Sequence, residues 1–398
     1  MSKKKYLLPI FMIVAVDVLG LTIVIPLLPF YAQKFGASAS QVGYLISTYA
    51  VFQLLAGPFL GSLSDRFGRR PILLISQIGT FIGFLVLARA NALWVVFLAR
   101  IIDGSTAGNI SVAQAYLADV TEAKDRAKGF ALIGISFGLG FFIGPWISGE
   151  LAQYGYTYPI FAAAFLSFLS ILGTFFLLPE PPTHAVMEGE AKLSVSRWSQ
   201  YRTHLQNPKL RSYLFQFLCF TFAFSLFFSG FPLFAQRRLM WNGHFFGPKE
   251  VGQIYAYSGF LGILIQGGVV ARVVRAFGEV NVAIFGFFMA FIGYIILGGT
   301  YTVPILVLSA TVSAFGTATI RPTLTALISR NAARNEQGMM LGLTQSINSI
   351  SQIAAPMVAG LMIEHGLLSH WAFLAGAITL IGLSLLIGAK KNAVKLAA

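Results

Sequence analysis

The chain contains few charged residues and only one cysteine. Of its 398 residues, 11% are charged and 56% are hydrophobic, whereas a soluble domain has roughly 25% charged residues. This composition excludes an ordinary soluble globular protein and indicates a membrane protein. The single Cys219 excludes an intrachain disulfide, so the fold does not depend on oxidation.

Signatures of several enzyme and cofactor sites are missing too. The phosphate-binding pattern GxxxxGK[ST] does not occur, so we expect no direct use of ATP. The five histidines lie in the central polar stretch or in short loops and form no metal-ligand cluster. We therefore predict no metal, no cofactor and no enzyme activity. The formal charge is +14, but the charges lie in short loops between apolar runs, which indicates membrane topology and no nucleic-acid partner.

The apolar residues fall into runs long enough to cross a bilayer, which takes roughly 20 residues as a helix. The first run continues to about residue 30 without a small-residue cleavage site, so we interpret it as an uncleaved span. We predict twelve spans, at 6–30, 39–61, 71–90, 93–117, 129–151, 158–178, 211–236, 250–271, 280–299, 302–328, 338–363 and 370–389.

Lysine and arginine predict the orientation of these spans. With the N-terminus inside, 21 of the 28 basic residues lie in inner segments, five lie in outer segments, and Arg100 and Arg321 lie within spans. Because basic residues concentrate on the cytoplasmic side, we expect both termini in the cytoplasm of a multi-pass inner (plasma) membrane protein. The long polar stretch 179–210 is then a cytoplasmic linker between an N-terminal bundle, 1–178, and a C-terminal bundle, 211–398.

The two halves of the sequence repeat each other. LPFYAQK at 28–34 returns as FPLFAQR at 231–237, and QVGYL at 41–45 as EVGQI at 250–254. DRFGRR at 65–70 returns in degraded form as RAFGEV at 275–280, and GPWISG at 144–149 as APMVAG at 355–360. The offsets lie between 203 and 211 residues. We predict an all-α membrane protein with two pseudosymmetric six-helix bundles, a plan used by transporters.

The stretch GSLSDRFGRRP at 61–71 places a dense charge cluster between spans 2 and 3. It resembles the signature loop of the major facilitator superfamily at Gly61, Asp65, Arg66, Gly68, Arg69 and Arg70. Asp65 ends a helix where it can meet the positive N-terminus of another helix, which the resemblance identifies as span 11. Gly68 permits a tight turn, and Arg69 can pair with Asp119 at the end of span 4.

We expect these residues, with Arg126, to form a cytoplasmic gate. The alternative is that Arg66 and Arg70 only anchor the loop. The C-terminal copy at 275–280 lacks the acid and the paired arginines, so we expect weaker gate contacts in that half.

Four further stretches narrow the resemblance to tetracycline efflux proteins and related drug:proton antiporters. The matching positions are Asp17, Gly20, Pro26, Pro29, Arg100, Gly104, Asp119, Arg126, Gly129, Gly140, Gly144, Pro145 and Gly149. The resemblance covers spans 1–5, whereas the C-terminal half matches only in plan. Ser148 replaces a glycine usual in the span-5 signature. Glycines four residues apart, here Gly140 and Gly144, let helices approach closely, so simple packing is an alternative reading.

Three ionisable residues within spans are candidates for proton coupling. Asp17 lies roughly 16 Å into span 1 at 1.5 Å per residue, near the bilayer midplane, and Asp103 reaches a similar depth in span 4. Arg100 lies one turn before Asp103. Charges at this depth are costly and mark functional sites. Asp17 can carry the proton and pair with Arg100, while Asp103 departs from the tetracycline-type pattern and is either a second proton site or a partner for Arg100. A static ion network is the alternative.

Polar residues that share helix faces predict a substrate cavity, since such faces point into the bundle. We assign to it Tyr49, Gln53, Ser111, Gln114, Gln253, Tyr257, Arg321, Gln345, Asn348 and Gln352. Arg321 can bind an anionic substrate, or it can extend to the membrane interface or bond carbonyls freed beside Pro322.

The function that these patterns favour is proton-coupled export of amphiphilic small molecules or drugs by alternating access. A symporter or exchanger of a polar or anionic metabolite is the alternative, and a lipid scramblase or a non-transporting receptor a more distant one. The expected partners are a small-molecule substrate, protons and the lipid bilayer, with the chain acting as a monomer.

Overall fold

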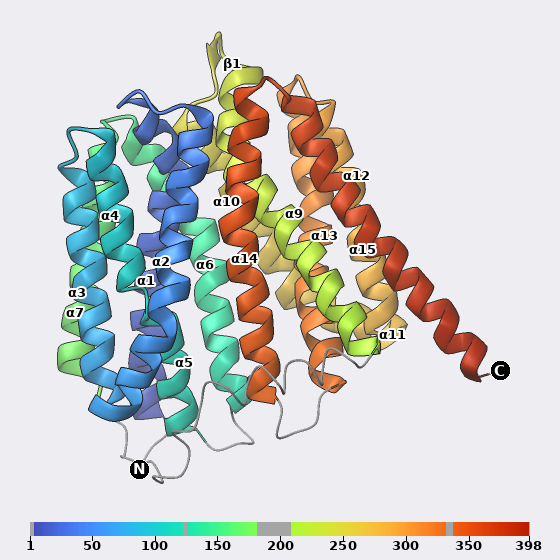
Figure 1. The fold of residues 1–398 in the computed structure, drawn as a ribbon, viewed down its shortest axis with the longest axis horizontal. Helices are drawn as coiled ribbons and strands as arrows, with labels where there is room; N and C mark the ends of the chain where they lie inside the picture. Colours follow the sequence, from blue (N-terminus) through green and yellow to red (C-terminus); the bar gives the residue numbers. More distant parts are fainter. Residues whose placement is uncertain (1–3, 122–125, 181–207, 332–336, 398) are drawn as a thin grey trace. The chain divides into compact units, whose positions relative to one another are not determined.

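The computed structural model describes residues 4–121, 126–180, 208–331 and 337–397, and it is almost entirely helical (Figure 1). A backbone in hydrocarbon has no water to bond, so its polar groups are satisfied within helices. In the described part, twelve helical segments are long and apolar enough to cross a membrane, which confirms the predicted fold class. Most of the predicted linker lies outside the described residues.

The first six spans comprise seven α-helices. They are α1 (Lys4–Gln33), α2 (Ala39–Phe67), α3 (Arg69–Ala88), α4 (Leu93–Ser105), α5 (Asn109–Val120), α6 (Arg126–Ala152) and α7 (Thr157–Leu177). Span 4 is divided between α4 and α5 by a short break at 106–108. Ser38 begins α2 with a capping box, because its hydroxyl accepts from the Gln41 backbone while the Gln41 side chain accepts from the Ser38 backbone.

The last six spans follow, with a short hairpin among them. The elements are α9 (Pro208–Arg238), β1 (Met240–Trp241), β2 (His244–Phe245), α10 (Pro248–Leu264), η1 (Ile265–Val270), α11 (Ala271–Phe277), α12 (Glu279–Gly298), α13 (Val303–Arg330), α14 (Gln337–Glu364) and α15 (Leu368–Ala397). Span 8 is interrupted by η1, a turn of π-helix at Ile265–Val270.

Residue contacts divide the chain into two compact units. Unit one holds the described residues of Met1–Ala185 together with Phe231–Arg237 and Asn242–Phe260, and unit two holds the others. In unit one, α1 packs against α6 and α7, while α3 packs against α4 and α7. In unit two, α12 packs against α13 and α15. The domain boundaries proposed from sequence stay a prediction.

The turn between spans 2 and 3 returns in the second half. Gly68 separates α2 from α3 at φ 98°, and Gly278 separates α11 from α12 at φ 77°. These angles lie in a region that glycine adopts without the clash of a side chain. The two glycines are 210 residues apart, in agreement with the repeat offset, so both copies of the motif make the same kind of turn.

Candidate functional site: a charged loop and a buried carboxyl cluster

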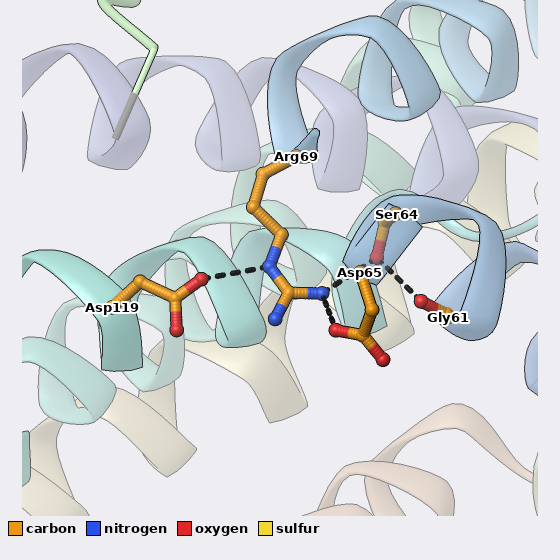
Figure 2. Close-up of polar contacts among 5 residues, drawn as sticks. All are labelled: Gly61, Ser64, Asp65, Arg69 and Asp119. Carbon is orange, nitrogen blue, oxygen red and sulfur yellow. Dashed lines mark hydrogen bonds and ion pairs between the residues drawn. The ribbon is translucent and has the colours of Figure 1, made fainter. Parts of the chain in front are cut away.

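Arg69 is the centre of the charged loop between α2 and α3 (Figure 2). Its Nε lies 2.7 Å from Asp119 Oδ2 at the end of α5, and its Nη1 lies 2.5 Å from Asp65 Oδ1 at the end of α2. Nη1 also donates to Ser64 Oγ at 2.7 Å, and Ser64 Oγ donates to the Gly61 carbonyl at 2.7 Å. One guanidinium therefore joins the ends of three predicted spans through charge-assisted hydrogen bonds.

The neighbouring Arg70 holds the loop to the end of span 6. Its Nε donates to the Thr174 carbonyl at 3.3 Å, its Nη2 donates to the Phe175 carbonyl, and its guanidinium lies 5.7 Å from the Phe175 ring centre. Arg70 thus anchors the loop, which agrees with the simpler of its two sequence readings. Arg126 begins α6, but its side chain lies outside the described part of the structure, and the expected contact of Asp65 with span 11 stays a prediction.

The C-terminal copy of the loop has an ion pair that the sequence reading missed. Arg330 Nη1, at the end of α13, lies 2.8 Å from Glu279 Oε1 at the start of α12. Glu279 is 210 residues after Arg69, and Arg330 is 211 residues after Asp119. The two pairs therefore occupy equivalent positions in the repeat with their charges reversed. The signal was present in the sequence as an acid directly after the motif glycine.

A small, partly open cavity lies within unit one beside the two acidic residues of spans 1 and 4. Asp17 of α1, Tyr49 and Gln53 of α2, Asp103 of α4 and Asn109 of α5 contribute to its wall. Gln53 Nε2 donates to Tyr49 Oη at 3.1 Å. Four of the residues assigned from sequence to coupling or substrate binding therefore share one cavity.

Arg100 and Asp103 form a buried ion pair at this cavity. Their side chains are 4% and 3% exposed, and Arg100 Nη1 lies 3.1 Å from Asp103 Oδ2. The Arg100 guanidinium also lies 5.8 Å from the centre of the Phe84 ring, within the range of a cation–π contact. In this structure Arg100 thus has the partner that the second sequence reading of Asp103 offered. The expectation that Asp17 is either protonated or paired with Arg100 at each stage of transport stays a prediction.

Asp17 has neutral hydrogen-bond partners instead. Gln77 of α3 places Nε2 3.4 Å from Asp17 Oδ2, and the side chains of Ser170 and Asn109 also hydrogen-bond this carboxyl. Two acids and one arginine meet here, so the group carries one excess negative charge when both acids are ionised. Sequence reasoning missed Gln77 and Asn109. Gln77 was visible as a glutamine inside the apolar span 3, and the position of Asn109 was indicated by Gly104 and Gly108 beside the break in span 4.

The other residues assigned to the substrate cavity lie in several places. Ser111, Gln114 and Gln253 are exposed in unit one, with Tyr257 partly buried there. In unit two, Arg321 and Gln345 are exposed, and Asn348 and Gln352 are partly buried. These residues come from both units, so their assignment to a common cavity stays a prediction.

The glycines of α6 lie against two neighbouring helices. A side chain at Gly144 would collide with Thr22 of α1, whose Oγ1 donates to the Gly140 carbonyl at 2.9 Å. Gly149 faces the backbone of α10, where a Cβ on it would lie 3.0 Å from Lys249 Cα. A side chain at Gly252 of α10 would in turn collide with the Pro145 carbonyl. Absence of side chains therefore permits this close packing.

Comparison with known proteins gives consistent matches over most of the chain. The family model described as Major Facilitator Superfamily matches residues 10–302 and 267–393. The chain is 31% identical to the class B tetracycline resistance protein of Escherichia coli over 373 residues, covering 89% of this chain and 88% of the relative. It is 28% identical to multidrug resistance protein 2 of Bacillus subtilis (strain 168), covering 92% and 90%.

Solved structures share the fold at lower identity. The nucleoside transporter NupG superposes with a TM-score of 0.79 at 14% identity, covering 96% of this chain and 99% of that one. The human organic anion transporter MFSD10 superposes with a TM-score of 0.74 at 22% identity, covering 97% and 100%.

Proposed function

Because this chain belongs to the Major Facilitator Superfamily, a family of membrane transporters, we propose that it exports amphiphilic small molecules or drugs in exchange for protons by alternating access. It is a multi-pass membrane protein and not an enzyme. The similarity to tetracycline and multidrug resistance proteins extends over about nine-tenths of the chain, which supports export as the direction of transport.

The observation that carries the proposal is the excess carboxyl group of unit one. Arg100 and Asp103 neutralise each other at 3.1 Å, which leaves Asp17 at the same cavity with neutral partners. An isolated carboxylate in low dielectric is costly, so Asp17 is stabilised by taking up a proton or by facing a cationic group of the substrate. Proton and substrate can then exclude each other at this cavity, as antiport requires.

The test is uphill transport in proteoliposomes with an imposed pH gradient, using tetracycline and ethidium as probes. Asp17→Asn keeps the shape of the side chain but cannot ionise. We expect it to abolish accumulation driven by the gradient while binding persists without pH dependence. Glu364→Gln, the same acid-to-amide change at an exposed residue that ends α14, is the control and should accumulate normally. Full accumulation by Asp17→Asn would overturn the assignment of the proton to this residue.

Exchange or symport of an anionic metabolite is the second candidate, because Arg321 is exposed in span 10. Proton flux separates the two functions. Adding substrate to vesicles without a pH gradient should move protons in the direction opposite to the substrate only in the antiporter. An anion that is taken up without proton movement, and whose uptake is lost in Arg321→Gln, would favour the exchanger.

We also infer that both termini and the 179–210 linker are cytoplasmic and that a single chain in the bilayer is the working unit. The distribution of lysine and arginine supports this orientation. An impermeant thiol reagent should label a cysteine placed at Asn242 in intact cells and should leave one placed at Ser194 unlabelled. The native Cys219 is buried and gives little background. Reversed labelling would refute the orientation, and a dimer mass by light scattering would refute the monomer.

A further inference from the structure

Gln77 is a completely buried amide that joins three spans of unit one. It lies in the middle of α3, where its Nε2 is 2.7 Å from Ser170 Oγ of α7 and 3.4 Å from Asp17 Oδ2 of α1. Ser167 Oγ, one turn before Ser170, donates to the Gln77 backbone carbonyl at 3.4 Å. The residue is therefore held from the α7 side while its amide group reaches Asp17.

The carbonyl oxygen of the same amide, Gln77 Oε1, is the part of this side chain without a hydrogen bond in the described part of the protein. Gln77 Oε1 is buried and has no hydrogen-bond partner among the described residues. Buried acceptors are nearly always paired in native proteins, so this oxygen requires an explanation. A carboxylate only accepts hydrogen bonds, whereas a protonated carboxyl group also has one O–H to donate. Oε1 can accept from a protonated Asp17 once the amide has turned and Oε1 occupies the place that Nε2 holds in this structure.

A rotation of the terminal amide connects the two situations. The last torsion of glutamine is broad and roughly two-fold, so a half-turn exchanges Nε2 with Oε1 while the rest of the side chain stays in place. In one orientation Nε2 donates to the Asp17 carboxylate. In the other, Oε1 accepts from the protonated carboxyl group, whose proton comes from water in the adjoining cavity and returns to it.

We propose that Gln77 is the positioning residue of Asp17 and hydrogen-bonds both of its protonation states, thereby setting the pH at which Asp17 gains and loses its proton. This proposal rests on the proposed function. The titratable groups that line the cavity with Asp17 are Asp103 of α4, which is paired with Arg100, and Tyr49 of α2. From α7 it is faced by Ser170, from α3 by Gln77 and from α5 by Asn109, all of which are neutral. Against α1, α6 presents Gly140 and Gly144.

Infrared titration of the protein in lipid vesicles tests this without a transported substrate. The carboxyl C=O absorption of protonated Asp17 is identified as the band that disappears in Asp17→Asn. Gln77→Met removes both hydrogen-bonding ends of the amide at similar length. A hydrogen bond to a charged group is roughly twice as strong as a neutral one, so the carboxylate loses more than the acid. We expect the titration midpoint to move to higher pH by roughly half to one unit and the band to shift in frequency.

The chain offers a matched control in unit two. Gln216 of α9 is also fully buried, donates from Nε2 to Ser212 Oγ at 3.1 Å, and has an Oε1 with no partner in the described part of the chain. Gln216→Met removes the same groups far from Asp17 in the sequence and should leave both midpoint and frequency unchanged. An equal shift in Gln216→Met would show a general structural effect and overturn the proposal.

Variants of Ser167 extend the test if Gln77→Met does not fold. Ser167→Ala removes the hydroxyl that donates to the Gln77 backbone carbonyl, without removing a group that hydrogen-bonds Asp17, and should move the midpoint in the same direction by a smaller amount, whereas Ser167→Thr keeps the hydroxyl and the wild-type titration. An unchanged midpoint in Gln77→Met or Ser167→Ala, with a band that still depends on Asp17, overturns the role of Gln77 alone. A protein without any band that depends on Asp17 would instead refute the proposed proton site.

Discussion

The buried ion pair of span 4 makes Asp103→Asn a strongly destabilising change. Arg100 and Asp103 are each at least 96% buried with charges 3.1 Å apart. At an effective dielectric constant of 20 their attraction is about 5 kcal/mol. The substitution removes this attraction and leaves the Arg100 guanidinium buried without its ionic partner, and breaking a buried pair in this way costs about 3–5 kcal/mol.

The measurement is equilibrium unfolding in mixed detergent micelles. We expect Asp103→Asn to lower the free energy of unfolding by about 3–5 kcal/mol, and Arg100→Met to do the same by leaving Asp103 unpaired. The double variant Arg100→Met/Asp103→Leu removes both charges, and its stability should lie much closer to that of the wild type, since an apolar pair replaces a buried ion pair at little net cost. Gln114→Ala, at an exposed residue of the same span, should stay within about 0.5 kcal/mol.

One result would refute this reasoning. A loss below about 1 kcal/mol in Asp103→Asn would show that Arg100 does not depend on Asp103 and finds another carboxylate. Asp17 lies at the same cavity and is the available candidate, as the sequence alone suggested. The variant Asp17→Asn/Asp103→Asn would then show the large loss that the single substitution lacks, and the structural assignment of the pair would be wrong.

Further predictions concern the loops and the helix packing. Asp65→Asn should leave the protein folded, because its side chain is 55% exposed, but reduce the rate of transport at least tenfold if the loop is a gate; a normal rate would refute the gate. Glu279→Gln should cost less than about 1 kcal/mol in a thermal or chemical unfolding assay, because its partner Arg330 is 71% exposed. Gly144→Ala should lower the unfolding temperature, since its Cβ would meet Thr22, while Gly134→Ala in the same helix has open space and should not.

Hydropathy was sufficient to predict the fold. Each span must hydrogen-bond its own backbone groups as a helix, and such a helix is visible in the sequence as one continuous apolar run. The Gly68 turn was also readable from the short motif. The contact of Arg69 with Asp119, 50 residues away, was expected together with the resemblance of the loop to the superfamily signature. The break in span 4 was not predicted, because the apolar run continues through it. Its position depends on contacts of Gly104 and Gly108 with α2, in which a Cβ on Gly104 would lie 2.7 Å from the Tyr49 carbonyl.

The neutral partners of Asp17 could not be predicted for a different reason. Gln77 is 60 residues away in the sequence, and only the packing of α1, α3 and α7 brings it to Asp17. A single polar residue in an apolar span gives no periodic signal, so its direction could not be assigned from sequence. Arg100 and Asp103, three residues apart on one helix, form an ion pair with each other, which leaves Asp17 to the neutral side chains around it.

The two equivalent ion pairs, Arg69–Asp119 and Glu279–Arg330, have reversed charges, so the helix dipoles disfavour one pair and favour the other. The N-terminal end of a helix favours negative charge and the C-terminal end favours positive charge. Glu279 begins α12 and Arg330 ends α13, so the pair in the second half agrees with both helix ends and can stand alone.

In the first half the signs oppose the helices. Arg69 begins α3 and Asp119 lies in the last turn of α5, so each charge is at the unfavourable end of its helix. Arg69 compensates with two further contacts, to Asp65 and to Ser64. Removing Asp65 therefore weakens the contacts of Arg69, whose pair with Asp119 is already disfavoured by the helix dipoles. The loss of Glu279 removes an ion pair whose charges the helix dipoles favour. This difference is the physical reason to expect the loop at 61–71, and not its copy, to respond most strongly to the loss of one acid.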